Sequence, residues 1–140
     1  MKNLFFIFLL VSVPLYSQAS KNIDSLFLVK DYLQNIRTTV NSKINNQKKT
    51  EKLDSLIRTA TKYKTIFDRN IRAIVKIREE ETELRTAINF ILQSMVLYRS
   101  DLKDRSENRT EILYLNKNIP ILINKIYYHT RMVNSAKYQQ

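Results

Sequence analysis

The chain has 140 residues, and 24 Lys and Arg against 13 Asp and Glu give it a formal net charge of +11. Glycine and cysteine are both absent, which excludes glycine-rich phosphate loops, disulfides and a lipid-modified N-terminal cysteine. Tight turns between strands depend on glycine at positive φ, whereas glycine weakens helices, so the composition favours an all-α fold. A chain of this length forms at most one domain.

The first nineteen residues have the pattern of an export signal. Lys2 supplies a positive start, residues 4–15 are almost wholly apolar, and Ser17 and Ala19 place small residues at −3 and −1 of a cleavage site. The apolar run is shorter than the roughly 20 residues that cross a bilayer core. We therefore expect residues 1–19 to be a cleaved signal peptide. Residues 20–140 would then be a single α-helical domain in a bacterial periplasm or outside the cell.

Residues 53–102 keep one heptad phase without a slip, and Asn70 and Glu81 are the frankly polar residues among its a and d positions. A repeat held this long predicts a continuous helix that packs one apolar seam against other helices. We expect this helix to begin at Thr50, whose hydroxyl suits a helix N-terminus. The candidate helix-packing seam contains Leu84, Ile88, Ile91, Met95 and Tyr98.

A shorter amphipathic helix is expected on each side of the long one. The first spans about 24–45, and the second follows residue 110, with apolar residues at 112, 115, 119, 122, 126 and 133. Short connections make sequential helices antiparallel, which predicts helical hairpins along a central coiled-coil helix. Two helices cannot enclose a core, so this arrangement needs self-association or a protein partner. The alternative is a break near residue 80, at the acidic run Glu79–Glu83, which gives a four-helix bundle.

A row of cations is the strongest electrostatic feature. Their spacing places them on the helix face opposite the seam, where the simplest interpretation is a solvated surface. The functional alternative is an anionic partner, such as an acidic protein or an anionic membrane surface. Nucleic acid is less favoured, because no aromatic residue interleaves the row and no nucleic-acid fold motif is present. This candidate anion-binding stripe is Arg58, Lys62, Arg69, Arg72 and Lys76.

The sequence predicts no catalytic residue, cofactor or metal site, and hence no enzyme. His129 is the only histidine, and no Glu-x-x-His or His-x-x-x-His pair supplies a second metal ligand. The carboxylates of Glu79–Glu83 radiate from successive helix positions, whereas acid and base catalysis needs groups that converge in a cleft.

The C-terminal half, with Arg99–Glu107 followed by a helix that finishes in Tyr127–Met132, resembles small exported helical proteins of conjugative transfer systems. Those proteins are similar to the minor pilus subunits of type IV secretion. The resemblance covers about residues 84–138 and implies a non-enzymatic part of an envelope-located transfer apparatus. Our first hypothesis is an exported α-helical interaction or structural protein of a conjugation or secretion assembly. The second is a basic periplasmic chaperone-like protein, or one that binds an anionic lipid or nucleic-acid surface.

Overall fold

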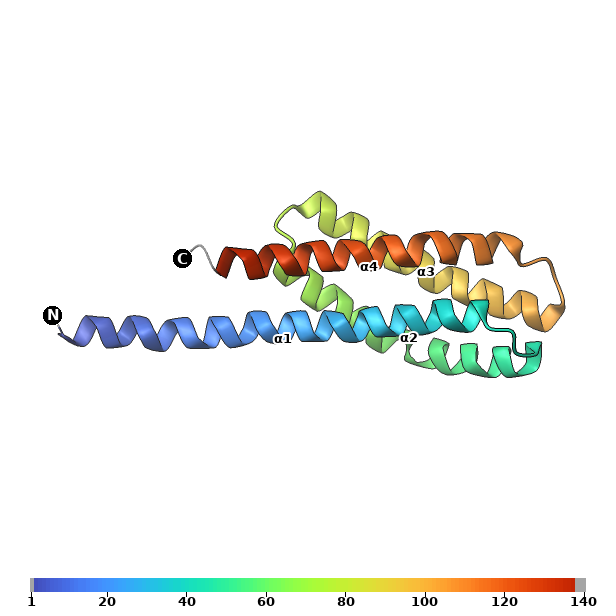
Figure 1. The fold of residues 1–140 in the computed structure, drawn as a ribbon, viewed down its shortest axis with the longest axis horizontal. Coiled ribbons are helices and arrows are strands. Elements are labelled where there is room, and N and C mark those ends of the chain that lie inside the picture. Colours follow the sequence, from blue (N-terminus) through green and yellow to red (C-terminus); the bar gives the residue numbers. More distant parts are fainter. Residues whose placement is uncertain (1, 138–140) are drawn as a thin grey trace.

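The computed structural model describes the backbone of residues 2–137 and the side chains of residues 17–136. Its four helices are α1 (Lys2–Asn41), α2 (Asn46–Ile74), α3 (Arg78–Asp104) and α4 (Arg109–Lys137), and no strand occurs in this range. They run alternately in opposite directions, and each packs against its neighbours in chain order, with α4 also against α1 (Figure 1). The prediction of an all-α fold is confirmed. The side chains of residues 1–16, which include the apolar run of the predicted signal peptide, lie outside the described residues.

The predicted continuous helix through residues 53–102 is wrong, because the chain breaks between α2 and α3. Val75 has φ −91° and ψ 124°, and Ile77 has φ −96° and ψ 120°, which are extended conformations. β-branched residues accept extended backbone readily, and the reversal lets the apolar faces of both helices share one core. The four-helix alternative is therefore correct, with its break a few residues before residue 80.

The charges beside the break suit the two helix ends that meet there. Glu79–Glu81 lie in the first turn of α3, and Arg72 lies in the last turn of α2. Carboxylates are favoured near the positive N-terminal end of a helix, and cations near its negative C-terminal end. The start of α2 is also earlier than predicted. Asn45 is its N-cap and accepts a 2.9 Å hydrogen bond from the backbone N–H of Lys48, so Thr50 lies inside the helix.

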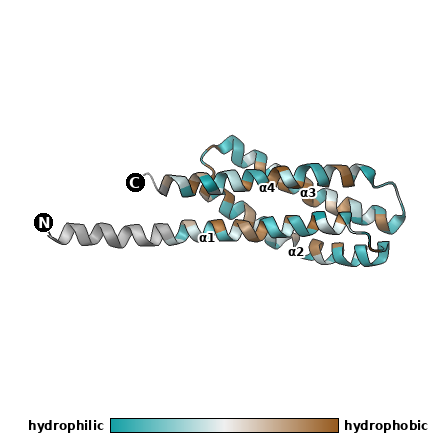
Figure 2. Ribbon diagram, viewed as in Figure 1, coloured by the Kyte–Doolittle hydropathy of each residue, from teal (hydrophilic) through white to brown (hydrophobic). Residues whose placement is uncertain are grey.

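The core lies between the four helices, and each supplies apolar residues three or four positions apart (Figure 2). All five residues of the helix-packing seam are buried, with at most 2% of each exposed. They pack in the same cluster as Leu26 and Leu33 of α1 and Leu115 and Ile119 of α4. The seam is thus covered by the chain's own helices, and the two-helix cross-section that required a partner does not occur.

Polar side chains tie α2 to its neighbours. The hydroxyl of Tyr32 in α1 donates to the carbonyl oxygen of Leu56 at 2.8 Å. On the other side of α2, the guanidinium of Arg99 donates to both carboxylate oxygens of Asp54, at 2.6 and 3.1 Å. This contact with Arg99 holds the pKa of Asp54 below its usual range. Direct bidentate pairing of this kind fixes the orientation of α3 on α2.

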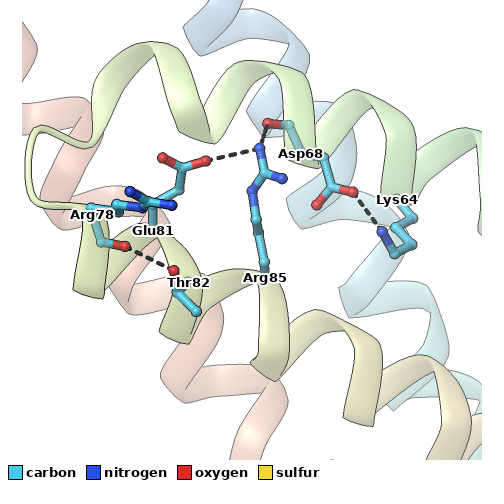
Figure 3. Close-up of polar contacts among 6 residues, drawn as sticks. All are labelled: Lys64, Asp68, Arg78, Glu81, Thr82 and Arg85. Carbon is cyan, nitrogen blue, oxygen red and sulfur yellow. Dashed lines mark hydrogen bonds and ion pairs between the residues drawn. The ribbon is translucent and has the colours of Figure 1, made fainter.

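A second polar cluster joins α2 and α3 close to the break (Figure 3). One Nη of Arg85 donates to the backbone carbonyl of Asp68 at 3.0 Å and pairs with the carboxylate of Glu81 at 2.8 Å. Lys64 lies 2.5 Å from the carboxylate of Asp68. Asp54 and Asp68 therefore both have a direct cationic partner, and Arg58 of α2 also contributes to the lowered pKa of Asp54.

Candidate functional site

Four of the five stripe residues lie on α2, and the fifth, Lys76, lies in the connection that follows this helix. All five are exposed. Lys76 follows the end of α2 at Ile74, so the prediction that it shares one helix face with the others is wrong. The break in the predicted helix is the reason for this change. The basic face of α2 consists of Arg58, Lys62, Arg69 and Arg72.

Two residues of this basic face line a cleft between α1 and α2 with a volume of about 510 Å³. They are Lys62 and Arg69, and Lys21 of α1 adds a third cation. The cleft wall also carries hydroxyl and amide groups, and none of its described lining residues is acidic. These uncharged polar residues include Asn22, Ser25, Thr61 and Thr65.

Among the described side chains, no cation of this face forms a direct ion pair, although Arg58 is close enough to Asp54 to help lower the pKa of that carboxyl. Lys62 and Arg69 lie beside donor groups in a cleft wall whose described residues include no acid, and unpaired cations in such a place are suited to bind an oxyanion. The cleft can therefore hold a negatively charged group, but it presents no acid, base or nucleophile arranged for covalent chemistry.

One aromatic residue does contact the stripe, contrary to the expectation from sequence. The ammonium of Lys62 lies 5.7 Å from the ring centre of Tyr63. The ring of Tyr63 is stacked on that of Tyr32, with centres 4.2 Å apart and planes inclined by 12°. Because one face of Tyr63 is covered in this way, it is a poor platform for an unstacked nucleic-acid base.

Sequence reasoning missed the half of the cleft that α1 provides. Ser25 follows Asn22 by three residues and Lys21 by four, so both are its neighbours on one side of α1. Asn70 was noted only as a polar interruption of the heptad pattern. It is buried, lines the cleft, and its amide donates to the carbonyl of Ile66 at 2.6 Å. The spacing of these polar residues on α1 could have been recognised in the sequence, but only the structure shows that they lie beside α2.

A second pocket of about 380 Å³ lies between the break and the end of α4. It is lined mainly by apolar side chains, among them Ile77, Tyr128 and Met132, which are exposed. The side chain of His129 is mostly buried there, with Nε2 3.8 Å from the carboxylate of Glu80. In the described part of the chain no group of three side chains is placed to hold a metal ion.

Comparisons with protein-family models, with curated proteins and with solved structures found no match to this chain. Within the described residues, no helix is both long enough and apolar enough to cross a membrane. The fold and the basic cleft are therefore the observations from which function is inferred.

Proposed function

We propose that this chain is an exported, non-enzymatic α-helical interaction protein that binds an anionic partner through the basic face of α2 and the adjoining cleft. The observation that supports this most directly is the set of four exposed cations that form no direct ion pair among the described side chains. The apolar seam lies inside the bundle, so an external partner has to contact another surface.

The distribution of charge along the chain supports an anionic partner. Helix α2 carries eight Lys and Arg against three Asp and Glu, whereas α3 carries four against six. The basic face extends from Arg58 to Arg72, which is roughly 20 Å along a helix. Each Lys or Arg held near an anionic membrane contributes about 1 kcal/mol, so this face would contribute about 4 kcal/mol. An extended row of this length matches an anionic surface better than a single small ligand.

The test compares two variants of the 20–140 protein that lose equal charge. The first replaces the basic face, as Arg58→Gln, Lys62→Gln, Arg69→Gln and Arg72→Gln. The control replaces four exposed cations of α3 and α4, as Lys103→Gln, Arg109→Gln, Lys117→Gln and Arg131→Gln. Glutamine is nearly as good a helix former as lysine or arginine, so circular dichroism should show unchanged helicity in both.

Binding is measured by co-sedimentation with phosphatidylglycerol vesicles, with phosphatidylcholine vesicles as the neutral reference. The parent should bind the anionic vesicles, and binding should weaken steeply as salt rises. The basic-face variant should bind more than about 100-fold less tightly, and the control variant should lose far less. Equal losses in the two variants would show that only net charge matters. Failure of the parent to bind would remove the anionic membrane as the partner.

A role in a conjugative transfer or secretion apparatus is the second part of the proposal, and it is supported by the resemblance of residues 84–138. Cross-linking in intact exporting cells, followed by mass spectrometry, tests it. The expected result is cross-links from the basic face to envelope components of a transfer apparatus. Cross-links to many unrelated unfolded acidic proteins would instead favour the basic chaperone-like alternative.

A further inference from the structure

The pocket of about 380 Å³ between the break and the end of α4 lies outside the basic face, since none of the four basic-face residues lines it. We call it the apolar pocket. Ile74 and Ile77 line it from the two sides of the break, and Met132, Val133 and Ala136 line it from α4. Small-molecule sites have mainly apolar walls and volumes of roughly 300–1,000 Å³, so this pocket has the character of a small-molecule site.

Three apolar side chains of this pocket stay exposed instead of packing in the core. Ile77 is 52% exposed, Tyr128 58% and Met132 55%. Single exposed apolar residues are ordinary, but three around one hollow leave a surface that is stabilised when an apolar group covers it. The side chain of Met132 is unbranched and flexible, so it can adapt to the shape of such a group.

The size of the apolar pocket favours a small molecule over a second copy of the chain. Nine described residues line it, whereas a stable protein interface uses roughly 20–30 residues on each side. Its volume is at the lower end of the range for small-molecule sites. A single hydrocarbon chain fits such a volume better than a phospholipid, which carries two chains and a head group.

The charged groups of the apolar pocket favour an anionic head group on that ligand. Lys76 lines the pocket, is exposed, and forms no ion pair with any described side chain. Glu80 also lines it, but its carboxylate lies 3.8 Å from Nε2 of His129 and forms no ion pair with Lys76. The ammonium of Lys76 is therefore available to a carboxylate of the ligand, and charge-assisted bonds of this kind are stronger than neutral ones.

We propose that the apolar pocket binds a free fatty acid, with its hydrocarbon chain against Ile77 and Met132 and its carboxylate at the ammonium of Lys76. This site is separate from the basic face of α2, so it adds a second ligand and does not depend on the proposed function. The two sites differ in chemistry, because the basic face offers charge over an extended surface and the pocket offers an apolar hollow with one cation.

The test titrates the 20–140 protein, which contains every residue of the core cluster, by isothermal titration calorimetry. The ligand is dodecanoate below its critical micelle concentration, and dodecyltrimethylammonium has the same chain with the opposite head charge. Dodecanoate should bind at a single site per chain. Because an exposed ion pair is worth up to about fivefold in affinity, Lys76→Gln should weaken dodecanoate binding by up to about fivefold. The same substitution should not weaken binding of the cationic ligand.

Three further variants locate the hydrocarbon chain. Ile77→Ser and Met132→Ser each remove an apolar wall of the pocket and should weaken dodecanoate binding about tenfold. The matched control is Leu97→Ser on α3, which changes a 54% exposed residue outside the pocket and should leave binding unchanged. All three positions are exposed, so circular dichroism should show the parent's helicity in each variant. The basic-face variant should retain dodecanoate binding.

Four results would contradict the inference. Equal losses in Ile77→Ser and Leu97→Ser would show that dodecanoate binds apolar surface without using the pocket. If dodecanoate does not bind, loss of vesicle binding in Ile77→Ser would assign the pocket to a membrane lipid, and a change of oligomeric state in Met132→Ser would assign it to a second copy. Dodecanoate binding only by a 20–137 protein would assign it to the chain's own C-terminal residues. In each case vesicle binding that depends on the basic face leaves the proposed function intact.

Discussion

The substitution Arg78→Pro tests whether the chain reverses at residues 75–77. Arg78 is the first residue of α3, and the N–H group at that position has no acceptor within a helix. Proline is favoured at the first helical position because its fixed φ suits the helix and it gives up no intrahelical bond. The preceding Ile77, with φ −96° and ψ 120°, already has the conformation that a residue before proline prefers.

The expected change in the free energy of unfolding is therefore within about 0.5 kcal/mol, as for other exposed substitutions. The matched control is Thr86→Pro, which changes an exposed residue two turns further into α3. There the proline ring removes the bond from the backbone N–H to the carbonyl of Thr82 and clashes with that carbonyl, at a cost of about 3 kcal/mol. For a domain of this size, 3 kcal/mol corresponds to a fall in Tm of about 10 °C.

Urea and thermal unfolding of the 20–140 protein, followed by circular dichroism at 222 nm, measure both variants against the parent. In a continuous helix through residue 78, both prolines would be interior and both would cost about 3 kcal/mol. An Arg78→Pro protein as unstable as Thr86→Pro would therefore refute the break. Retention of the parent's Tm by Arg78→Pro, with a clear loss in Thr86→Pro, is the result that the structure requires.

Two further predictions concern the core and its polar boundary. Ile88→Ala should lower the free energy of unfolding by about 2–5 kcal/mol, because Ile88 is fully buried. The control Phe90→Ala, at a 52% exposed position, should change it little. Denaturant titration measures both variants. Burial raises the pKa of Tyr32 above its ordinary value, so its neutral hydroxyl contributes fully to the free energy of unfolding below about pH 10. As the pH rises further, the tyrosine ionises first in the unfolded state, and this contribution to stability is lost. Tyr32→Phe should lower the free energy of unfolding by about 1 kcal/mol at pH 7, because it removes the hydrogen bond to Leu56. In thermal melts recorded above pH 10, the stability of this variant should fall less with rising pH than the stability of the parent.

Much of the fold was predictable because it depends on local composition and spacing. The absence of glycine favoured helices, and residues three or four apart, such as Leu26, Val29 and Leu33, defined the faces that are buried. The break was missed because neither Val75 nor Ile77 is a helix breaker. The break forms because closing the bundle buries the apolar faces of α2 and α3, which stabilises the fold more than one further turn of helix would. That balance depends on contacts across the whole chain and not on the residues at the break.

The heptad pattern continued across the break for a physical reason. Ile74 and Ile77 stand three residues apart, as a continuous seam requires, yet Ile74 is buried and Ile77 is 52% exposed. An apolar residue in an extended connection satisfies the same spacing without packing in the core. The charged residues at the break carried the better signal, because Arg72 and Glu79 suit the end of one helix and the start of another.

The candidate cleft was only half predictable from sequence. The spacing of Lys62 and Arg69 placed them on the outer side of α2, but nothing in the pattern paired them with Lys21. That pairing depends on the direction and register of α1 on α2, which are fixed by long-range contacts such as the bond from Tyr32 to Leu56. Long-range register is the information that hydrophobic spacing lacks.

The basic surface follows from where folding places the acids. The first turn of α3 carries Glu79–Glu81, where carboxylates stabilise a helix N-terminus, and Glu83 next to them pairs with Lys125 of α4. Asp54 is paired with Arg99 of α3, and Asp68 is paired with Lys64 one turn earlier in α2. Among the described side chains, none of these acids forms an ion pair with a residue of the basic face of α2. The cations left there repel one another unless counterions or an anionic partner cover them, and that repulsion is relieved when such a partner binds.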